Sequence, residues 1–282
     1  MTGLPFLALA SHQLYFLLVK SRVPPFAERV FSAANVECFT TCGAARTYAT
    51  LAWLSVLAMS IGSVGGHRGM QDFNLVGGVV SMLILAVFDA ELAVSRDAVG
   101  LLGLGGTVVV GLAMLVGRYR GQTAAAHPAK ISPALRYCSS IPTLLLALLN
   151  LYQVAVVNAI SHIPKPTLTC QTGCGSARVF ACLFWSLQLV LACAMLIRGE
   201  EVARPMATAK TLVGAGLAQL HHRGAVAPAV GLLGAYEVMC GVMLLAACRP
   251  KKGKGKGGKG KGKSKKSGGD KREKRRAAAK TE

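Results

Sequence analysis

Charged side chains are scarce in this chain of 282 residues, and only 12 of them are acidic. Asp, Glu, Lys and Arg make up 16% of the sequence, whereas roughly 25% is usual in soluble domains. Hydrophobic residues make up 52%, and the mean hydropathy is +0.47. A soluble fold of this composition would lack the polar surface needed to cover itself. The composition therefore excludes an ordinary soluble domain and indicates an integral membrane protein.

The short motifs of the common enzyme classes are also missing. The sequence contains no HExxH, no nucleophile elbow and no P-loop, and its six histidines are scattered. The glycine-rich run GLLGLGG, which begins at Gly100, lies inside an apolar stretch and follows no strand. It therefore indicates close helix packing rather than a dinucleotide site. We expect a protein that is not an enzyme and that needs no cofactor.

Apolar runs close to the length of a membrane span dominate the chain. A helix needs about 20 apolar residues to cross a bilayer, and the helix itself must satisfy its backbone polar groups there. We expect about eight transmembrane helices, although the first, third and seventh runs are short and Lys210 interrupts the seventh. The runs are Leu4–Val19, Ala44–Ile61, Asn74–Phe88, Ala98–Val116, Ile141–Ile160, Ala177–Ile197, Met206–Leu220 and Ala225–Cys248.

Positive charge is concentrated at the C-terminal end of the sequence. Residues 249–282 carry 16 basic and three acidic residues, a net charge of +13, and the rest of the chain carries 16 basic and nine acidic residues, or +7. This Lys/Gly-rich segment is of low complexity and its like charges repel, so we expect it to be disordered. We expect it to bind anionic lipid headgroups, at about 1 kcal/mol per basic residue, and we do not expect a nucleic-acid partner.

Several features occur twice, in the same order. CGAARTYATLAWLS from Cys42 corresponds to CGSARVFACLFWS from Cys174, 132 residues later, and another cysteine lies four positions before each. LPFLALASHQLY near the N-terminus corresponds to IPTLLLALLNLY from Ile141, and AVGLLG occurs at Ala98 and again at Ala229. We infer two repeats of four helices each.

An even number of helices in each repeat means that both repeats enter the membrane from the same side, as parallel repeats. Both termini and the linker then share one side. Residues 118–137 contain four basic residues and no acid, and the tail is strongly basic. The positive-inside rule places that side in the cytoplasm. The expected organisation is a first repeat at 1–120, a basic linker at 121–137, a second repeat at 138–250 and a disordered tail at 251–282.

The stretch ARTYATLAWLS, Ala45–Ser55, resembles the most recognisable part of the ergosterol biosynthetic protein 28 family. That family opens a membrane helix with Ala-Arg-Thr-aromatic-Gly-Thr-Trp-Thr-Leu-Leu-Ser, and the tryptophan is displaced to Trp53 in this chain. The resemblance covers the first repeat, and the second repeat resembles a diverged duplicate in which Val179 stands in place of Thr47. Three further features are similar to that family. The dipeptide Leu-Pro at Leu4 opens a first helix that reaches Gln13, and the stretches FDAE from Phe88 and AMLVGRYR from Ala113 resemble the ends of the third and fourth helices.

The resemblance implies a non-enzymatic scaffold of the endoplasmic reticulum membrane. Members of that family gather the enzymes that remove the C4 methyl groups of sterols. The implied partners are therefore membrane-bound sterol-modifying enzymes. A homo-oligomer is also compatible with this function.

Residues of the repeated motifs are candidate contacts with partner helices or lipid headgroups. Arg46 and Arg178 each open an apolar helix, where an arginine can reach the headgroups, and a tryptophan follows seven residues later in both copies. Glu91 lies just after the third run, at the expected end of the third helix, where it either contacts a partner or is solvated at the interface. The candidates are Arg46, Thr47, Trp53, Glu91, Arg178 and Trp185.

Two Cys-x3-Cys pairs, Cys38 with Cys42 and Cys170 with Cys174, leave three interpretations open. Four thiolates from symmetric loops are a weak candidate for a Cys₄ zinc site, because zinc sites usually use the spacing Cys-x2-Cys. A lumenal disulfide within or between the loops is the second interpretation. Free thiols are the third. We expect no metal.

Two other classes of function compete with the scaffold. Parallel repeats with Gln13 and Gln153 in matching helices suit a small transporter or channel, which needs a water-accessible tunnel lined by these residues. A membrane enzyme that uses the cysteine loops is the other class, and it predicts loss of activity when those cysteines become serines. Solid packing with apolar outward surfaces favours the scaffold.

Overall fold

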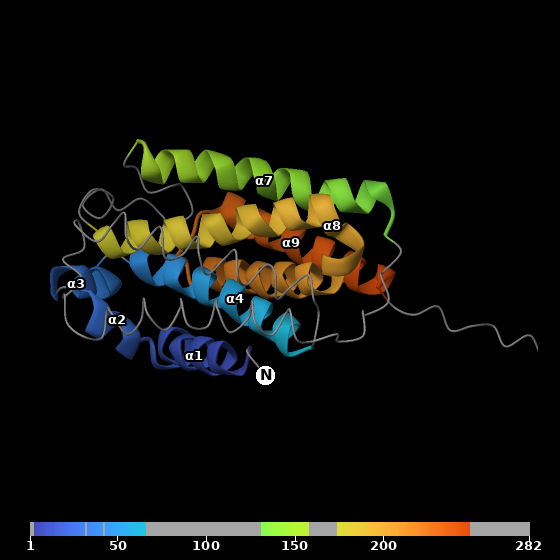
Figure 1. Ribbon diagram of the computed structural model, residues 1–282. Helices are drawn as coiled ribbons and strands as arrows, with labels where there is room; N and C mark the ends of the chain where they lie inside the picture. The colour runs from blue at the N-terminus through green and yellow to red at the C-terminus, as the bar shows by residue number, and fades with distance from the viewer. Residues whose placement is uncertain (1–2, 32, 42, 66–130, 158–173, 249–282) are drawn as a thin grey trace, which may run out of the picture. The chain divides into compact units, whose positions relative to one another are not determined.

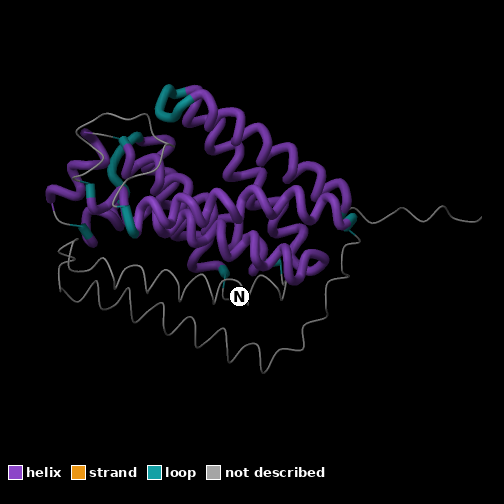
Figure 2. The backbone as a smooth tube through the Cα atoms, turned by 90° about the horizontal axis from the view of Figure 1, so that it is seen from above, coloured by secondary structure: helices purple, strands orange, loops and turns teal. Residues whose placement is uncertain are grey.

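The computed structural model describes residues 3–31, 33–41, 43–65, 131–157 and 174–248 of the chain. These residues form helices joined by short loops, and no β-strand occurs among them (Figure 1, Figure 2). The expected all-α class is confirmed. The elements are α1 Leu4–Leu14, the π-helix η1 Tyr15–Lys20, α2 Pro25–Val30, α3 Ala33–Thr41, α4 Ala44–Val64, α7 Pro133–Ala155, α8 Gly175–His222 and α9 Pro228–Ala247.

Among the described residues, four helices are long and apolar enough to cross a membrane, namely α4, α7, α8 and α9. A shorter apolar stretch, Leu4–Lys20, combines α1 and η1. These helices support the coarser prediction of a multi-pass membrane protein. The runs at 74–88 and 98–116 lie outside the described residues, so the count of eight spans stays a prediction, as do the expectations for the tail at 251–282.

Helix α8 is too long to cross a bilayer once. Its 48 residues would measure about 72 Å if straight, against a hydrocarbon core of about 30 Å. The helix bends at Arg198, whose φ of −125° and ψ of 43° are not helical. Gln188 of the first arm lines the same cavity as Val213 of the second, so the arms, residues 175–197 and 199–222, lie antiparallel (Figure 1). The arms correspond to the sixth and seventh apolar runs.

Hydrogen bonds from arginines to helix carbonyls determine which helix ends lie together. Arg46, at the start of α4, donates to Leu17 O near the end of η1 (2.8 Å). We call this end of the bundle the disulfide end, after the disulfide described below. Arg136, at the start of α7, donates to Met195 O (3.0 Å), just before the bend of α8. We call this second end the kink end.

Two further arginines define the direction of α9. Arg223, just after α8, donates to Leu18 O (3.1 Å), which brings the loop before α9 to the disulfide end. Arg204, near the bend of α8, donates to Cys248 O (3.1 Å) just after α9. Helix α9 therefore runs from the disulfide end to the kink end, as α4 and the first arm of α8 do.

Helix α7 begins earlier than the sequence indicates. The apolar run predicts a start at Ile141, whereas the helix begins at Pro133, inside the segment 121–137 that the sequence assigns to the linker. The Ser132 side chain accepts a hydrogen bond from Leu135 N (3.3 Å), and proline is preorganised for the first helical turn. Capping rather than hydrophobicity sets this boundary.

Helices α8 and α9 approach each other closely at paired glycines. A Cβ atom added to Gly214 would lie 2.7 Å from Gly234 O and 2.8 Å from Val238 N, and one added to Gly241 would lie 2.8 Å from Ala207 O. Backbone atoms cannot move aside as the tip of a flexible side chain can. Small residues at this crossing therefore permit close packing of the two helices.

The substitution Gly214→Ala tests this crossing. Alanine is favoured over glycine in a helix by about 1 kcal/mol, so an open position would gain stability. At Gly214 the added methyl group meets backbone atoms, and we expect a loss equivalent to about 1–3 kcal/mol, measured as a lower unfolding temperature in detergent. Ala215→Leu, on the neighbouring exposed face, is the control and should leave unfolding unchanged. Equal or higher stability of Gly214→Ala would show that the helices do not touch there.

Candidate functional site

A buried ion pair joins the second arm of α8 to α9. Lys210 Nζ lies 2.5 Å from Glu237 Oε2, and the two residues are 2% and 6% exposed. Each lies near the middle of its helical segment, and α9, which carries Glu237, is long and apolar enough to span a membrane. Ionisable residues at such depth are rare and mark functional sites by default.

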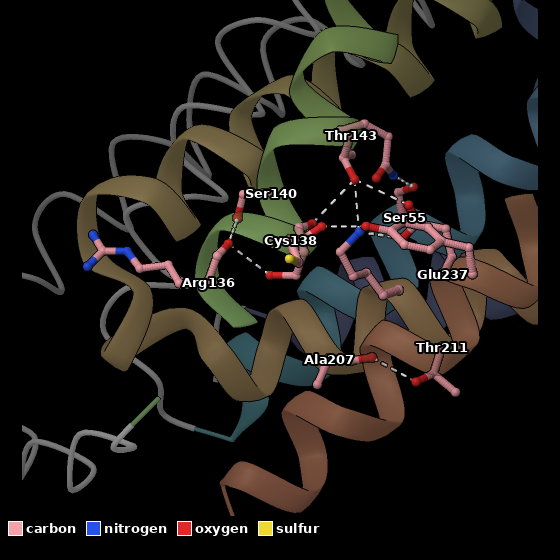
Figure 3. Close-up of polar contacts among 12 residues, drawn as sticks. Ser55, Arg136, Cys138, Ser140, Thr143, Ala207, Thr211 and Glu237 are labelled. Atoms are coloured by element: carbon pink, nitrogen blue, oxygen red, sulfur yellow. Dashed lines mark hydrogen bonds and ion pairs between the residues drawn. The ribbon is translucent and has the colours of Figure 1, made fainter. Parts of the chain in front are cut away.

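Thr143 of α7 completes this cluster (Figure 3). Its Oγ1 accepts a hydrogen bond from Lys210 Nζ (2.9 Å) and donates one to Glu237 Oε1 (3.2 Å). A hydroxyl has one donor and two acceptor sites, so it can satisfy both partners at once. We call these three residues the polar cluster. It connects α7, α8 and α9.

The pairing makes two charges tolerable inside an apolar bundle. An unpaired lysine or aspartate at mid-membrane costs about 2.5–3.5 kcal/mol on insertion scales. Removing one partner of a buried pair costs about 3–5 kcal/mol, whereas replacing both by apolar residues of similar volume is often neutral. The pair is therefore a device for specificity or function more than a source of net stability.

A second buried polar contact joins α4 to the first arm of α8. Gln188 Nε2 donates to Ser55 Oγ (3.0 Å), and both side chains are buried. Ser55 Oγ in turn donates to Leu51 O within α4 (2.9 Å). This contact fixes α4 against α8 as the polar cluster fixes α7 and α9.

A small cavity of about 20 Å³ lies between the two contacts. Thr143, Gln188 and Glu237 supply its polar lining, and apolar side chains such as Leu146 and Leu217 supply the rest. Such a volume holds about one water molecule, whereas ligand pockets measure about 300–1,000 Å³. The cavity is too small for a substrate.

Four arginines, Arg46, Arg136, Arg204 and Arg223, cap the ends of helices. The last carbonyls of a helix lack partners within it and carry negative partial charge, which favours a cation. Two of these arginines lie at the disulfide end and two at the kink end. Arg46 therefore binds inside the protein, in addition to any contact with headgroups.

A disulfide joins Cys38 of α3 to Cys174, the residue that precedes α8, and their Cα atoms lie 5.8 Å apart. Of the three interpretations of the cysteines, the disulfide between loops is the one that the structure contains. Both sulfurs are used, so a Cys₄ zinc site with them does not form in this state. Cys42 and Cys170 lie outside the described residues. Within the described ranges, no group of three or more His, Cys, Asp or Glu side chains could hold a metal.

Three of the predicted contact residues lie inside the bundle. Thr47, Trp53 and Trp185 are 2%, 9% and 3% exposed. The face of the helix that carries these residues turns toward neighbouring helices of the same chain, and their role as contacts with a partner or a lipid stays a prediction. Their equal spacing in both copies reflects helix packing.

The other predicted residues lie at the surface or outside the described part. Arg46 and Arg178 are half-buried at the starts of α4 and α8, and Glu91 lies outside the described residues. Gln13 is buried on α1 and Gln153 is half-buried on α7, and neither lines the cavity beside the polar cluster. A tunnel lined by both glutamines is not seen among the described residues.

We compared the chain with known proteins. It matches no protein-family model, and no significant match was found among curated proteins or solved structures. The resemblance to the ergosterol biosynthetic protein 28 family therefore stays a hypothesis that rests on the quoted residues.

Sequence reasoning missed the polar cluster, although a signal exists. Lys210 is the only Lys, Arg, Asp or Glu between Arg204 and Arg223, and Glu237 is the only one between Arg223 and Arg249. One basic and one acidic residue in consecutive apolar runs predict a pair. Within the seventh run alone, Lys210 only interrupts the apolar sequence, because one run does not show which adjacent helix supplies its partner.

Removing one member of the ion pair should destabilise the bundle. Lys210→Met leaves Glu237 buried without its cation, and we expect a loss of about 3–5 kcal/mol in equilibrium unfolding in detergent. The double variant Lys210→Met/Glu237→Leu should recover most of this loss. Glu201→Gln, which breaks an exposed pair with Arg198 at 3.9 Å, is the control and should change stability by less than about 1 kcal/mol. A Lys210→Met variant as stable as the wild type would exclude the pair.

Loss of the disulfide should also lower stability. Cys38→Ser removes a cross-link that spans 136 residues of sequence, and removal of a native disulfide costs about 2–5 kcal/mol. Cys138→Ser, at an exposed free cysteine, is the control. The unfolding temperatures of both variants should be measured with and without reductant. If reductant lowers that of the wild type and leaves that of Cys38→Ser unchanged, the cross-link is present; equal behaviour would contradict it.

Proposed function

We propose that the protein is a non-enzymatic scaffold of the endoplasmic reticulum membrane that holds enzymes of sterol C4-demethylation next to one another. The partners and the sterol class rest on the resemblance of Ala45–Ser55 to the ergosterol biosynthetic protein 28 family. A scaffold that holds consecutive enzymes together raises the effective concentration of a membrane-bound intermediate, and it needs no chemistry of its own.

The observation that supports a scaffold best is an apolar stripe on the outer face of α7. Only 28% of the most apolar part of α7 is buried in the bundle, compared with 78% of that of α4. The stripe follows the spacing of a single helix face. It therefore offers a side to a partner helix within lipid. The α7 stripe consists of Ile141, Leu145, Leu148, Leu149 and Tyr152.

The interior of the described bundle supports the same function. The cavity between α7, α8 and α9 that the described residues line holds about one water molecule. A scaffold acts through its sides and needs no chamber. A transporter needs a chamber large enough for its substrate.

The proposed arrangement is two parallel repeats of four helices with both termini in the cytoplasm. Helices α7 and α9 and the two arms of α8 supply four helical segments in the second half. Disulfides persist in oxidising compartments such as the lumen of the endoplasmic reticulum. Helix α9 leads from the disulfide end to the kink end, where the basic sequence after Cys248 begins. The positive-inside rule and the disulfide thus favour the same orientation.

The polar cluster favours one alternative, a small transporter. Lys210 and Glu237 form an intramembrane charge pair, and such pairs occur in ion and proton pathways. In that case, flux into proteoliposomes would require both residues. If the protein is a scaffold, flux into proteoliposomes that contain it should equal the flux into protein-free vesicles.

Affinity capture in mild detergent tests the scaffold. Enzymes of sterol C4-demethylation should co-purify with the wild type. The triple variant Leu145→Ala/Leu148→Ala/Tyr152→Ala shortens the α7 stripe without adding charge, and we expect it to reduce capture about tenfold, equivalent to about 1.4 kcal/mol. The matched control is Leu232→Ala/Met239→Ala/Val242→Ala on the exposed face of α9.

Two results would contradict this function. If none of these enzymes co-purifies with a wild-type protein that remains folded, the scaffold assignment is wrong. If both triple variants lose the enzymes equally, the α7 stripe is not the contact surface.

A further inference from the structure

Two arginines converge on adjacent carbonyls at the disulfide end. Arg46, in the first turn of α4, donates to Leu17 O (2.8 Å), and Arg223, directly after α8, donates to Leu18 O (3.1 Å). The two guanidinium groups are near enough to interact electrostatically, and the interaction is repulsive. Two like charges held close together create a positive potential that favours the binding of an anion.

Among the described residues, no carboxylate balances these charges. Neither Arg46 nor Arg223 takes part in the ion pairs seen between described residues, which involve Arg198 and Lys210. The end of η1 contributes roughly half a negative charge and the start of α4 roughly half a positive charge, so these helix dipoles cancel. The site therefore keeps close to its full positive charge.

The surroundings add to this positive potential. Lys20 and Arg22 lie at the end of η1 and just after it, and both are exposed. Arg46 is half-buried and Arg223 is exposed, so an anion can approach from the surface of the bundle.

Most donors of the two guanidinium groups have no hydrogen-bond partner among the described residues. A guanidinium carries five N–H donors, and each of these arginines uses one of them on a described carbonyl. The fork of donors matches two oxygens of a phosphate group, which arginine binds in bidentate fashion. Two such forks side by side suit one phosphate better than they suit a single carbonyl each.

We propose that Arg46 and Arg223 bind the phosphate group of a membrane lipid at the disulfide end. Both arginines lie where apolar helices end, which is the depth of the lipid headgroups. The lipid supplies the missing negative charge while its acyl chains lie along the apolar helices. The bound phosphate then connects η1, α4 and the loop before α9. This inference does not depend on the proposed function.

The test uses the full chain in mild detergent and counts bound lipid by native mass spectrometry. The probes are phosphatidic acid and a diacylglycerol with the same acyl chains, which differ only in the phosphate. We expect one phosphatidic acid molecule to bind more tightly than the diacylglycerol. Arg223→Gln and Arg46→Gln should each weaken that binding about tenfold or more, since a hydrogen bond to a charged group is lost.

The control is Arg198→Gln, an exposed arginine at the kink end, which should bind phosphatidic acid as the wild type does. All variants keep the basic tail, and its contribution is screened at high salt. Because Arg223 is exposed, Arg223→Gln remains informative even if Arg46→Gln fails to fold. Wild-type affinity in Arg223→Gln would show that this arginine only caps a helix and would overturn the proposal. Displacement of phosphatidic acid by inorganic phosphate would indicate a site for free anions and would contradict the lipid assignment.

Discussion

Lys210 and Glu237 pair with each other in the interior of the bundle, where both side chains are buried away from water. Their pairing sets the rotation of the second arm of α8 against α9, and Thr143 draws α7 into the same arrangement. A rotation of one helix would leave a charge in lipid at a cost of about 2.5–3.5 kcal/mol or more. The polar cluster therefore selects one packing among the many that apolar side chains alone would allow.

The same packing brings α8 and α9 close together at Gly214 and Gly234. Beyond the cluster, satisfaction of polar groups shapes both ends of the bundle. Arginines cap carbonyls at the disulfide end and at the kink end, and the Cys38–Cys174 disulfide joins α3 to the start of α8. In a chain with so few acidic residues, backbone carbonyls and lipid take the place of carboxylates as partners for arginine.

Much of the fold could be predicted from the sequence, because apolar runs of spanning length have few alternatives to helix in lipid. The all-α class and the two arms of α8 could both be predicted from these apolar runs. The start of α7 at Pro133 could not be predicted from hydrophobicity, because a serine cap extends the helix into polar sequence. The burial of Trp53 and Trp185 depends on which face meets a neighbour, and the sequence of one helix does not contain that information. Arg223 reaches Leu18 only through the tertiary fold.

The central claim is that a lysine–glutamate pair inside the membrane organises α7, α8 and α9. An experimental structure of the full chain in a lipid nanodisc tests it most directly, through the separation of Lys210 Nζ from the Glu237 carboxylate. The account predicts a separation within about 4 Å, the limit for an ion pair, with the Thr143 hydroxyl in contact with both. Side chains that point apart, or a Glu237 that faces lipid, would contradict it.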